Sequence, residues 1–390
     1  MPNTRPTWIE LDLAAAAHNM RRLRQIAGVP VMAVVKANAY GHDAPLLART
    51  FLEHGATRLA VATVGEAHIL REAGITAPIM ILGYVPAWQA PEAVALRVTC
   101  AVYDLELAHA LARAASDHDW RVPVHINVDT GMSRLGLYHA DPAMLAADVV
   151  AFIRALHALP TLHVEGLFTH FATADEADQS YAETQLARFE QVLAAVTAAG
   201  VRPPVIHAAN SAATLRLPAA RFDLVRPGIA CYGLHPSSDT PLPPDFQPVL
   251  TLASEIAQVK TVAAGTPASY GCTWVASRPS LLVTLPLGYA DGLRRTTAWR
   301  EVLLCGQRAP IVGRVCMDYV IVDATDVVAP QPLRCGDPVV LIGKQYDPHT
   351  GTLKQISAEE VAGWLGTINY EVTSMLMARI PRVARSTRSD

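Results

Sequence analysis

Lys36 has the clearest chemical potential in the sequence, because it ends an unbroken apolar run. The run at 31–36 is short and rich in valine, which is typical of a strand buried on both faces of a parallel sheet. Burial of the lysine stem favours the neutral amine, a nucleophile that can form a Schiff base with a carbonyl compound. The alternative is an ordinary lysine at a strand terminus that extends its ammonium group into water. The rest of the chain has to decide between the two.

Further polar residues follow later apolar runs of the same kind. They are Asn38 and Tyr40 after the first run, Asn127 and Arg134 after the fifth, His170 at the end of the sixth, Ser211 after the seventh, and Arg226, Gly228 and Ile229 after the eighth. The last two groups offer a hydroxyl, a glycine that permits close backbone approach, and backbone amides, which together suit a phosphate group. Each piece alone could be an ordinary loop.

The elements that position these residues alternate between strands and helices. Strands are expected at 31–36, 59–64, 79–83, 100–102, 124–128, 164–170, 205–208 and 224–226, and helices at 45–54, 66–73, 105–116, 142–156 and 182–199. Asp104 and Asp141 occupy expected N-caps, and Gly55, Gly74 and Gly200 occupy expected helix ends. Eight strands alternating with helices predict an α/β fold with an N-terminal (β/α)8 TIM barrel. A doubly wound open sheet is the competitor, but no GxGxxG motif follows the first strand.

The composition of the sequence changes near residue 241, where a proline-rich stretch indicates a linker. Beyond it, β-rich segments are expected at 249–261, 281–287, 302–305, 311–321 and 339–342, with one helix capped by Ser357 and Glu360. We therefore expect a barrel at 1–240 and a C-terminal, mainly β domain at 241–390. Whether the first residues pack with the β domain is left open.

Composition narrows the class of protein. Hydrophobic residues make up 51% and charged residues 17% of a 390-residue chain with net charge −3, which indicates a globular protein with no footprint for nucleic acid. No apolar stretch is long enough for a membrane span and no secretory h-region is seen at the start, so we expect a cytoplasmic protein. Six scattered cysteines and the lack of metal-binding motifs predict no metal site.

A Schiff-base lysine on the first strand, combined with a phosphate site after strands seven and eight, suggests pyridoxal 5′-phosphate as the cofactor. The phosphate groups of ligands in such barrels are often held by those two loops. The lysine and the two loops together are stronger evidence for a cofactor site than any one of these loops alone.

The same residues lie in motifs that resemble those of the alanine racemase family. The motifs are AVVKANAYGH at 33–42, DTGMSRLG at 129–136, THFATAD at 169–175, HAANSA at 207–212, RPGI at 226–229, SYG at 269–271, GYADG at 288–292, VCMD at 315–318 and TINYE at 367–371. They follow the family order over nearly the whole chain. The resemblance implies an isomerase with a barrel, a C-terminal β domain, and a homodimer that shares its active sites.

The resemblance also assigns roles to residues. Lys36 would carry the cofactor and exchange a proton on one face of the substrate, and Tyr270 of the partner subunit would do so on the other face. His170 and Arg226 would assist Tyr270, because a free tyrosine has a pKa of about 10 and needs help to act as a base. Arg226 would face the pyridine nitrogen, and because it does not give up its proton, that nitrogen would stay unprotonated.

Binding roles are implied in the same way. Phosphate contacts would come from Tyr40, Ser211, Tyr370 and the amides of Gly228 and Ile229. The substrate carboxylate would meet Arg134 and the amide of Met317 of the partner subunit, and Tyr289 with Tyr370 would narrow the entrance in favour of a small side chain.

The sequence departs from the family pattern at three positions. Asn127 stands where a lysine modified to a carbamate is common, so we predict a bound anion such as chloride near Asn127 and Arg134. Leu293 replaces an aromatic residue after GYADG, and Asp43 replaces a glycine.

The leading hypothesis is racemisation of L- and D-alanine, within D-alanine biosynthesis for peptidoglycan precursors or within alanine breakdown. Asn127 and Leu293 make a racemase of broader specificity the closest rival. A decarboxylase using pyridoxal 5′-phosphate would need an acidic residue in place of Arg226, and a non-catalytic protein that binds the cofactor would need neither the β domain nor Tyr270.

Overall fold

The computed structural model describes residues 5–295 and 299–385, and these form two compact units. The barrel unit consists of Ala16–Ala39 and Ala44–Gln247. The β unit consists of the described residues up to Ala15, together with Tyr40–Asp43 and the chain from Pro248 onward. The chain therefore enters the β unit for four residues immediately after the Lys36 segment.

The barrel unit is built on seven parallel strands that pair in chain order. They are β2 (Val31–Val34), β3 (Ala56–Val61), β4 (Ile79–Ile81), β5 (Thr99–Val102), β6 (Val122–Asn127), β7 (Leu162–Phe168) and β8 (Val205–His207). The expected strands at positions one to seven are thereby confirmed, with ends that differ by a few residues. Nearly every residue of β2 to β5 is buried, as expected for strands covered on both faces.

The eighth position closes the curled sheet without forming a full strand. Residues 224–226 were expected to be a strand, but the structure has an isolated parallel bridge between Val31 and Val225. The amides of Met32 and Val34 donate to the carbonyls of Val225 and Pro227, and the Arg226 amide donates to Ala209 on the other side. Pro227 has no amide to donate, which limits how far this segment can continue the ladder.

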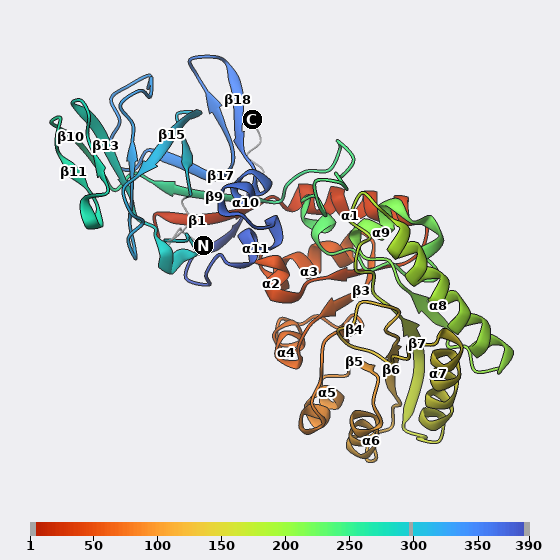
Figure 1. The fold of residues 1–390 in the computed structure, drawn as a ribbon. Helices are drawn as coiled ribbons and strands as arrows, with labels where there is room; N and C mark the ends of the chain where they lie inside the picture. Colours follow the sequence, from red (N-terminus) through yellow and green to blue (C-terminus); the bar gives the residue numbers. More distant parts are fainter. Residues whose placement is uncertain (1–4, 296–298, 386–390) are drawn as a thin grey trace. The chain divides into compact units, whose positions relative to one another are not determined.

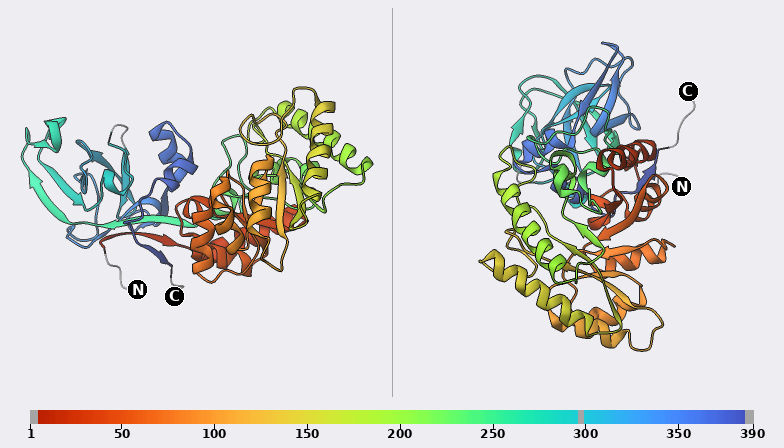
Figure 2. Two further views of the ribbon diagram at one scale, coloured as in Figure 1. Left: turned by 90° about the horizontal axis from the view of Figure 1, so that it is seen from below. Right: turned by 90° about the vertical axis from the view of Figure 1, so that its right-hand side faces the viewer.

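Helices cover the outside of the curled sheet, and α7 and α8 pack against each other there (Figure 1 and Figure 2). The helices and 3-10 turns are α1 (Leu13–Ala27), α3 (Ala44–Glu53), α4 (Val64–Glu72), η1 (Ala87–Gln89), α5 (Ala90–Ala95), α6 (Leu105–Ala114), α7 (Pro142–His157), α8 (Ser180–Ala198), α9 (Ser211–Arg216), η2 (Pro218–Ala220) and η3 (Ile229–Tyr232). The expected N-caps are confirmed, since Asp104 accepts from the Leu107 amide and Asp141 from the Ala143 and Met144 amides. No helix in the described part of the chain combines the length and apolar character that a membrane crossing requires.

Lys36 itself does not lie in a strand, contrary to the expectation for 31–36. Strand β2 ends at Val34, and α2 (Lys36–Tyr40) is a left-handed turn in which residues 37–40 have φ between 52° and 55°. This conformation costs non-glycine residues energy and is kept only where surrounding contacts impose it. The turn therefore aims the residues after Lys36 in directions that an ordinary helix or strand would not allow.

The β unit contains one large, mostly antiparallel sheet with the order β10-β13-β16-β15-β14-β17-β9-β1-β19, and β18 pairs with β17. Its strands are β1 (Thr7–Leu11), β9 (Leu250–Glu255), β10 (Gln258–Val262), β13 (Ser280–Leu285), β14 (Glu301–Leu304), β15 (Gln307–Val312), β16 (Val320–Asp323), β17 (Pro338–Asp347), β18 (Thr352–Ile356) and β19 (Arg382–Ala384), and a separate hairpin joins β11 (Pro267–Ala268) to β12 (Trp274–Val275). The N-terminal strand β1 alternates buried and half-buried residues and pairs with β9 and β19.

Three local expectations in the β unit need correction. The segments expected at 249–261 and 311–321 are each split into two strands by a turn or loop. The capping box at the start of α10 (Ala358–Leu365) is only half formed: Ser357 accepts from the Glu360 amide, but the Glu360 carboxylate binds Arg308 instead. A guanidinium offers two charged donors, which a single backbone amide does not match. Helix α11 (Asn369–Ser374) follows directly.

Candidate active site

Lys36 is half-buried at the carboxyl end of β2, in the barrel unit. Burial lowers the pKa of its amine, the positive charge of Arg134 lowers it further, and Glu66 opposes the shift. A lower pKa increases the fraction of neutral, nucleophilic amine at neutral pH. The environment therefore fits the reactive interpretation of Lys36 better than that of a lysine extended into water.

Glu66 fixes the turn that carries Lys36, a role that the sequence analysis did not assign. Its Oε1 accepts from the Ala37 amide at 2.6 Å, and its Oε2 accepts from the Ala62 amide at 2.7 Å. The same carboxylate completes a capping box with Thr63 at the start of α4. The Thr-x-x-Glu spacing at 63–66 is a recognisable capping signal, so this residue could have been found from the sequence.

Arg226 is 3% exposed and donates in several directions. Its Nη2 donates to the carbonyls of Thr169 and Ala208 at 2.8 and 3.0 Å and lies 3.3 Å from Nδ1 of His170. Its Nη1 lies 2.7 Å from Nδ1 of His207. Burial lowers the pKa of Arg226 to about 9, so the guanidinium is still charged at neutral pH.

His170 comes two residues after β7 and contacts Arg226, as the expected strand-end position implies. Its pKa is lowered to about 3, first by burial and then by the charges of Arg226, Arg134 and Lys36. The imidazole is therefore neutral at physiological pH. Because arginine can only donate, Nδ1 of His170 accepts, and the ring proton is on Nε2.

Two buried histidines and a glutamate continue from Arg226 and were also missed. Nε2 of His207 lies 2.7 Å from Nδ1 of His125, and Nε2 of His125 lies 2.9 Å from Oε2 of Glu165. Glu165 in turn accepts two hydrogen bonds of 2.8 Å from Arg58. A histidine in the middle of a strand that is buried on both faces needs a polar partner, and this was the available signal in the sequence at 125 and 207.

Ser211 organises the segment that follows the eighth position. Its Oγ accepts from the amides of Gly228 and Ala230 at 2.9 and 3.3 Å, and the Ile229 amide lies between these two in the chain. The hydroxyl thus draws the 228–230 backbone close while keeping its own proton to donate. Hydroxyl and amide donors brought together in this way can bind an anion, and the phosphate role of Ser211, Gly228 and Ile229 stays a prediction.

Asn127 and Arg134 lie on either side of the loop after β6. Nδ2 of Asn127 donates to the Leu135 carbonyl at 3.1 Å, which ties Asn127 to the residue next to Arg134. The Asn127 carbonyl accepts from the Leu137 amide, and Gly136 sits so close to the Asp129 amide that a Cβ there would be 2.7 Å away. Arg134 is exposed, and its charge is felt at both Lys36 and His170.

In the β unit, Tyr289 and Met317 lie on adjoining segments. The amides of Tyr289 and Ala290 donate to the carbonyls of Cys316 and Met317 at 3.0 Å each. A Cβ on Gly288 would stand 2.2 Å and 2.4 Å from those same carbonyl oxygens, so only glycine permits this approach. The structure therefore brings together two residues that the sequence placed in one substrate site.

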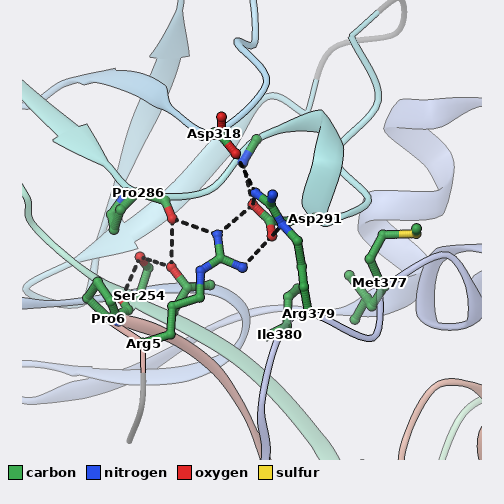
Figure 3. Close-up of polar contacts among 12 residues, drawn as sticks. Arg5, Pro6, Ser254, Pro286, Asp291, Asp318, Met377, Arg379 and Ile380 are labelled. Atoms are coloured by element: carbon green, nitrogen blue, oxygen red, sulfur yellow. Dashed lines mark hydrogen bonds and ion pairs between the residues drawn. The ribbon is translucent and has the colours of Figure 1, made fainter.

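Asp291 anchors this pair of segments through a charged cluster (Figure 3). The buried carboxylate binds Arg5 at 2.5 and 2.9 Å and Arg379 at 2.6 and 3.0 Å, and Arg379 also reaches Asp318 at 2.6 Å. Burial alone would raise the pKa of Asp291, but the hydrogen bonds from the two arginines and the Gly288 amide outweigh it and lower the pKa to about 2. The cluster thus connects the turn of Tyr289 (η5, Tyr289–Asp291) to the loop of Met317.

The remaining three predicted site residues, and Leu293 from the departures noted in the sequence, are also in the β unit. Tyr40 and Tyr370 face each other with ring centroids 5.9 Å apart and an interplanar angle of 53°. Tyr270 begins the 3-10 turn η4 (Tyr270–Cys272), and its side chain is 66% exposed. Leu293 is fully buried, so it is a packing residue rather than part of an exposed rim.

Comparison with known proteins identifies the family in which this combination of a barrel unit and a β unit occurs. The family model described as the N-terminal domain of alanine racemase matches residues 11–236, and that of the C-terminal domain matches residues 249–384. The chain belongs to the alanine racemase family. This membership confirms the expected family, the barrel with a C-terminal, mainly β domain, and the class of enzyme, an isomerase.

Individual relatives and solved structures are similar over nearly their full length. An alanine racemase of Desulfovibrio desulfuricans is 44% identical over 97% of this chain and 98% of its own. The crystal structure of alanine racemase from Bacillus anthracis with bound L-Ala-P has a TM-score of 0.89 at 39% identity, covering 99% of this chain and 97% of that one. A histidine racemase from Leuconostoc mesenteroides has a TM-score of 0.87 at 28% identity, covering 99% of both chains.

Proposed function

We propose that this enzyme interconverts L- and D-alanine with pyridoxal 5′-phosphate, using Lys36 and Tyr270 as the two proton carriers. Membership of the alanine racemase family supports racemisation of alanine. The observation that carries the rest is the environment of Lys36. An amine with a lowered pKa shares the barrel unit with a buried arginine and with a hydroxyl that binds two backbone amides.

The donors of the barrel unit fit this cofactor. Lys36 would hold it covalently, and Ser211 with the amides of Gly228 and Ile229 would bind its phosphate. Tyr40 and Tyr370 of the β unit would add phenol hydroxyls to the phosphate site. When bound, the cofactor supplies an electron sink that acidifies the substrate α-carbon.

Arg226 would face the pyridine nitrogen and set the strength of that electron sink. Among the described residues no carboxylate contacts Arg226, and its partners are carbonyl oxygens and neutral imidazoles. A guanidinium keeps its proton and can only share it as a donor, so the nitrogen would stay unprotonated. A weaker sink limits side reactions such as transamination, which suits an enzyme that only moves a proton.

Racemisation requires one proton carrier on each face of the α-carbon. Lys36 would act on one face, and Tyr270 of a second copy of the chain, in a homodimer with shared sites, would act on the other. The exposure of Tyr270 supports a role outside its own unit. His170, which is neutral and bonded to Arg226, would donate its Nε2–H to the phenol oxygen of Tyr270 and so stabilise the phenolate form.

Substrate recognition would combine a cation, an amide and an aromatic constriction. Arg134 and the amide of Met317 from a second copy of the chain would bind the carboxylate of the substrate, and Tyr289 with Tyr370 would restrict the side chain. The bond from Gly288 to the Asp291 carboxylate supports a fixed position for Tyr289.

We further propose that an anion such as chloride binds near Asn127 and orients Arg134. Asn127 brings an amide but no charge, whereas Arg134 is an exposed cation. Halide is first removed by dialysis into a buffer without acetate or sulfate and is then added back. If the anion orients Arg134, adding halide back should raise the affinity for alanine severalfold. A KM that is independent of halide, with only water between Asn127 and Arg134 in a well-determined map, would remove this part of the proposal.

A racemase of broader specificity is the second candidate. The observation that favours it is the histidine racemase of the same fold, since it shows that this architecture accommodates a larger side chain. The two candidates differ only in which amino acids pass the constriction at Tyr289 and Tyr370.

The decisive experiment is incubation of the cofactor-loaded protein with a panel of L-amino acids, followed by chiral chromatography. We expect conversion of alanine far above that of serine and longer side chains. Comparable conversion of several amino acids would favour the broader racemase, and no conversion of any would reject both.

A further inference from the structure

Arg226 presents a problem of charge compensation. It is a buried cation, and buried charges in proteins are normally paired with an opposite charge. In residues 5–295 and 299–385, however, the groups that contact its fork are carbonyl oxygens and histidine nitrogens. Its compensating anion has to be reached indirectly.

The hydrogen bonds from Arg226 lead to such an anion in a fixed direction. Arginine only donates, so Nδ1 of His207 must accept and the His207 proton must be on Nε2. That proton is donated to Nδ1 of His125, whose own proton is then on Nε2 and is donated to Oε2 of Glu165. Arg58 donates to the same carboxylate from the far side. From Arg226 through the two histidines, each hydrogen bond is therefore donated in the direction of Glu165.

The pKa values agree with two neutral imidazoles. Burial lowers the pKa of His125 despite the opposing effect of Glu165, and burial with the charge of Arg226 lowers that of His207 well below its usual value. Burial would raise the pKa of Glu165, but the hydrogen bonds from His125 and Arg58 hold it well below its usual range. This hydrogen-bonded series therefore has the Arg226 cation at one end, two neutral rings in the middle, and at the other end the Glu165 carboxylate, which also pairs with Arg58.

Packing around the rings leaves them no alternative place. A Cβ on Gly166 would stand 2.3 Å from Nδ1 of His125, so the glycine in β7 makes the space for that ring. The Phe168 ring stacks on His207 at 4.9 Å with an interplanar angle of 3°, and it also lies 5.3 Å from the Arg226 guanidinium carbon. The positions of the two histidine rings are thus fixed by the packing of neighbouring residues.

We propose that Glu165 is a positioning residue for Arg226: it fixes the proton positions of His125 and His207, and so holds Nη1 of Arg226 in place. This inference rests on the proposed function of Arg226 at the cofactor ring. Glu165 does not itself touch substrate or cofactor. Its effect is to keep the Arg226 guanidinium oriented and protonated at the position where it would face the pyridine nitrogen.

The Glu165 end of this hydrogen-bonded series borders a cavity, which makes the proposal testable. Arg58 and Glu165 line a cavity of about 760 Å³ together with Arg71, Arg121 and Trp120. The Glu165 side chain is 18% exposed, whereas that of His125 is fully buried. A small carboxylate in solution can therefore reach the position of the Glu165 carboxylate if that side chain is removed.

The test uses Glu165→Gln and Glu165→Ala in the cofactor-loaded enzyme. Gln keeps an oxygen that can accept from His125 but removes the charge, and Ala removes both. We expect kcat for alanine to fall about ten- to a hundredfold in Ala and less in Gln, with KM changed less than about threefold, as is typical for outer partners of active-site groups. Asp326→Ala is the matched control, because it breaks an exposed carboxylate–arginine pair with Arg278.

Two further readouts separate positioning from mere stability. Formate should restore much of the lost kcat in Glu165→Ala, whereas formamide, which has a similar size but no charge, should not. The ¹⁵N chemical shift of the pyridine nitrogen in labelled cofactor should move in both Glu165 variants and not in Asp326→Ala. Unchanged kcat and unchanged shift in a folded Glu165→Gln and Glu165→Ala would overturn the proposal.

A measurement without cofactor distinguishes this inference from the proposed function. In ligand-free protein, ¹⁵N spectra of the histidine side chains should show His125 and His207 as neutral rings protonated on Nε2. A proton on Nδ1 of either ring at neutral pH would overturn the inference and leave the proposed function intact. A wild-type enzyme that does not racemise any amino acid would reject the function, whatever the histidine spectra show.

Discussion

The two units each contain a buried charged group, and they stabilise it in opposite ways. In the β unit the buried anion Asp291 is clamped directly by Arg5 and Arg379, with hydrogen bonds of 2.5 to 3.0 Å. Among the residues that the structure describes, the buried cation Arg226 of the barrel unit donates to neutral groups, and the Glu165 carboxylate is reached from it through two imidazoles.

The difference follows from what each charge has to do. A direct clamp uses the donors and acceptors of both partners, which suits a residue that only has to hold a turn in place. In the proposed function Arg226 would instead face a ligand, and a carboxylate in direct contact with it would compete with that ligand. We therefore expect changes in the barrel network to affect chemistry first, and changes at Asp291 to affect stability first.

The largest expected effect is that of Lys36→Ala, which should abolish racemisation and the absorbance of lysine-bound cofactor. The ligand-free variant should be no less stable than the wild type, because burial of Lys36 disfavours its charged form and the substitution removes that cost. Activity assays, cofactor absorbance and thermal unfolding measure the three properties. Retention of activity and absorbance would mean that another lysine carries the cofactor.

Tyr270→Ala should lose most racemisation, since general acid–base groups typically contribute about 10²- to 10⁴-fold. The exposed position of Tyr270 predicts that folding and cofactor binding are retained. Exchange of the α-hydrogen in deuterated water should persist for one enantiomer, through Lys36, and fall for the other. Equal rates of exchange for both enantiomers would contradict the two-carrier assignment.

Asp291→Asn should destabilise the β unit by roughly 3 kcal/mol, because it leaves two arginines beside a buried neutral amide. Chemical unfolding measures this loss, and Asp326→Ala, at an exposed ion pair, should cost less than about 1 kcal/mol. Equal losses in the two variants would break the comparison drawn between the buried clamp and surface pairs.

The same residue predicts a pH dependence of stability. The pKa of Asp291 is about 2 in the folded state, below the ordinary value of 3.8, so its stabilisation is present above pH 4 and is lost as the pH falls toward 2. The difference corresponds to roughly 2 kcal/mol. Asp291→Asn should therefore flatten the acid limb of the stability curve relative to the wild type, and an unchanged limb would assign it to other carboxylates.

Motifs and strand periodicity were enough to predict seven barrel strands and the β-rich second region, whereas the roles of the site residues stay predictions. Helix caps depend on neighbours in sequence, which is why Asp104 and Asp141 were found. The left-handed turn after Lys36 could not be predicted, because its residues, among them Ala37 and Ala39, do not favour positive φ and are held there by contacts from elsewhere in the chain.

The charge networks escaped prediction for a related reason. His125 and His207 are 82 positions apart, and Arg5 is 286 positions from Asp291, so no local spacing links them. Only the pairing of β6 with β7 and of β7 with β8 places the histidines side by side. A buried histidine in a strand signals that a partner exists, but the fold is needed to identify it.

The smallest expected effect concerns Asp43, where backbone strain and side-chain charge can be separated. Its φ of 116° lies where glycine is favoured, which gives a physical reason for the glycine usual at this position, and its carboxylate acts electrostatically on Arg382. Asp43→Ala keeps the strain and loses the charge, whereas Asp43→Gly loses both. We expect Gly to be more stable than Ala by about 1 kcal/mol, measured by thermal unfolding, because strain of this kind costs at least that much. If Ala equals Gly, strain at residue 43 is negligible, and the charge beside Arg382 alone decides its contribution to the β unit.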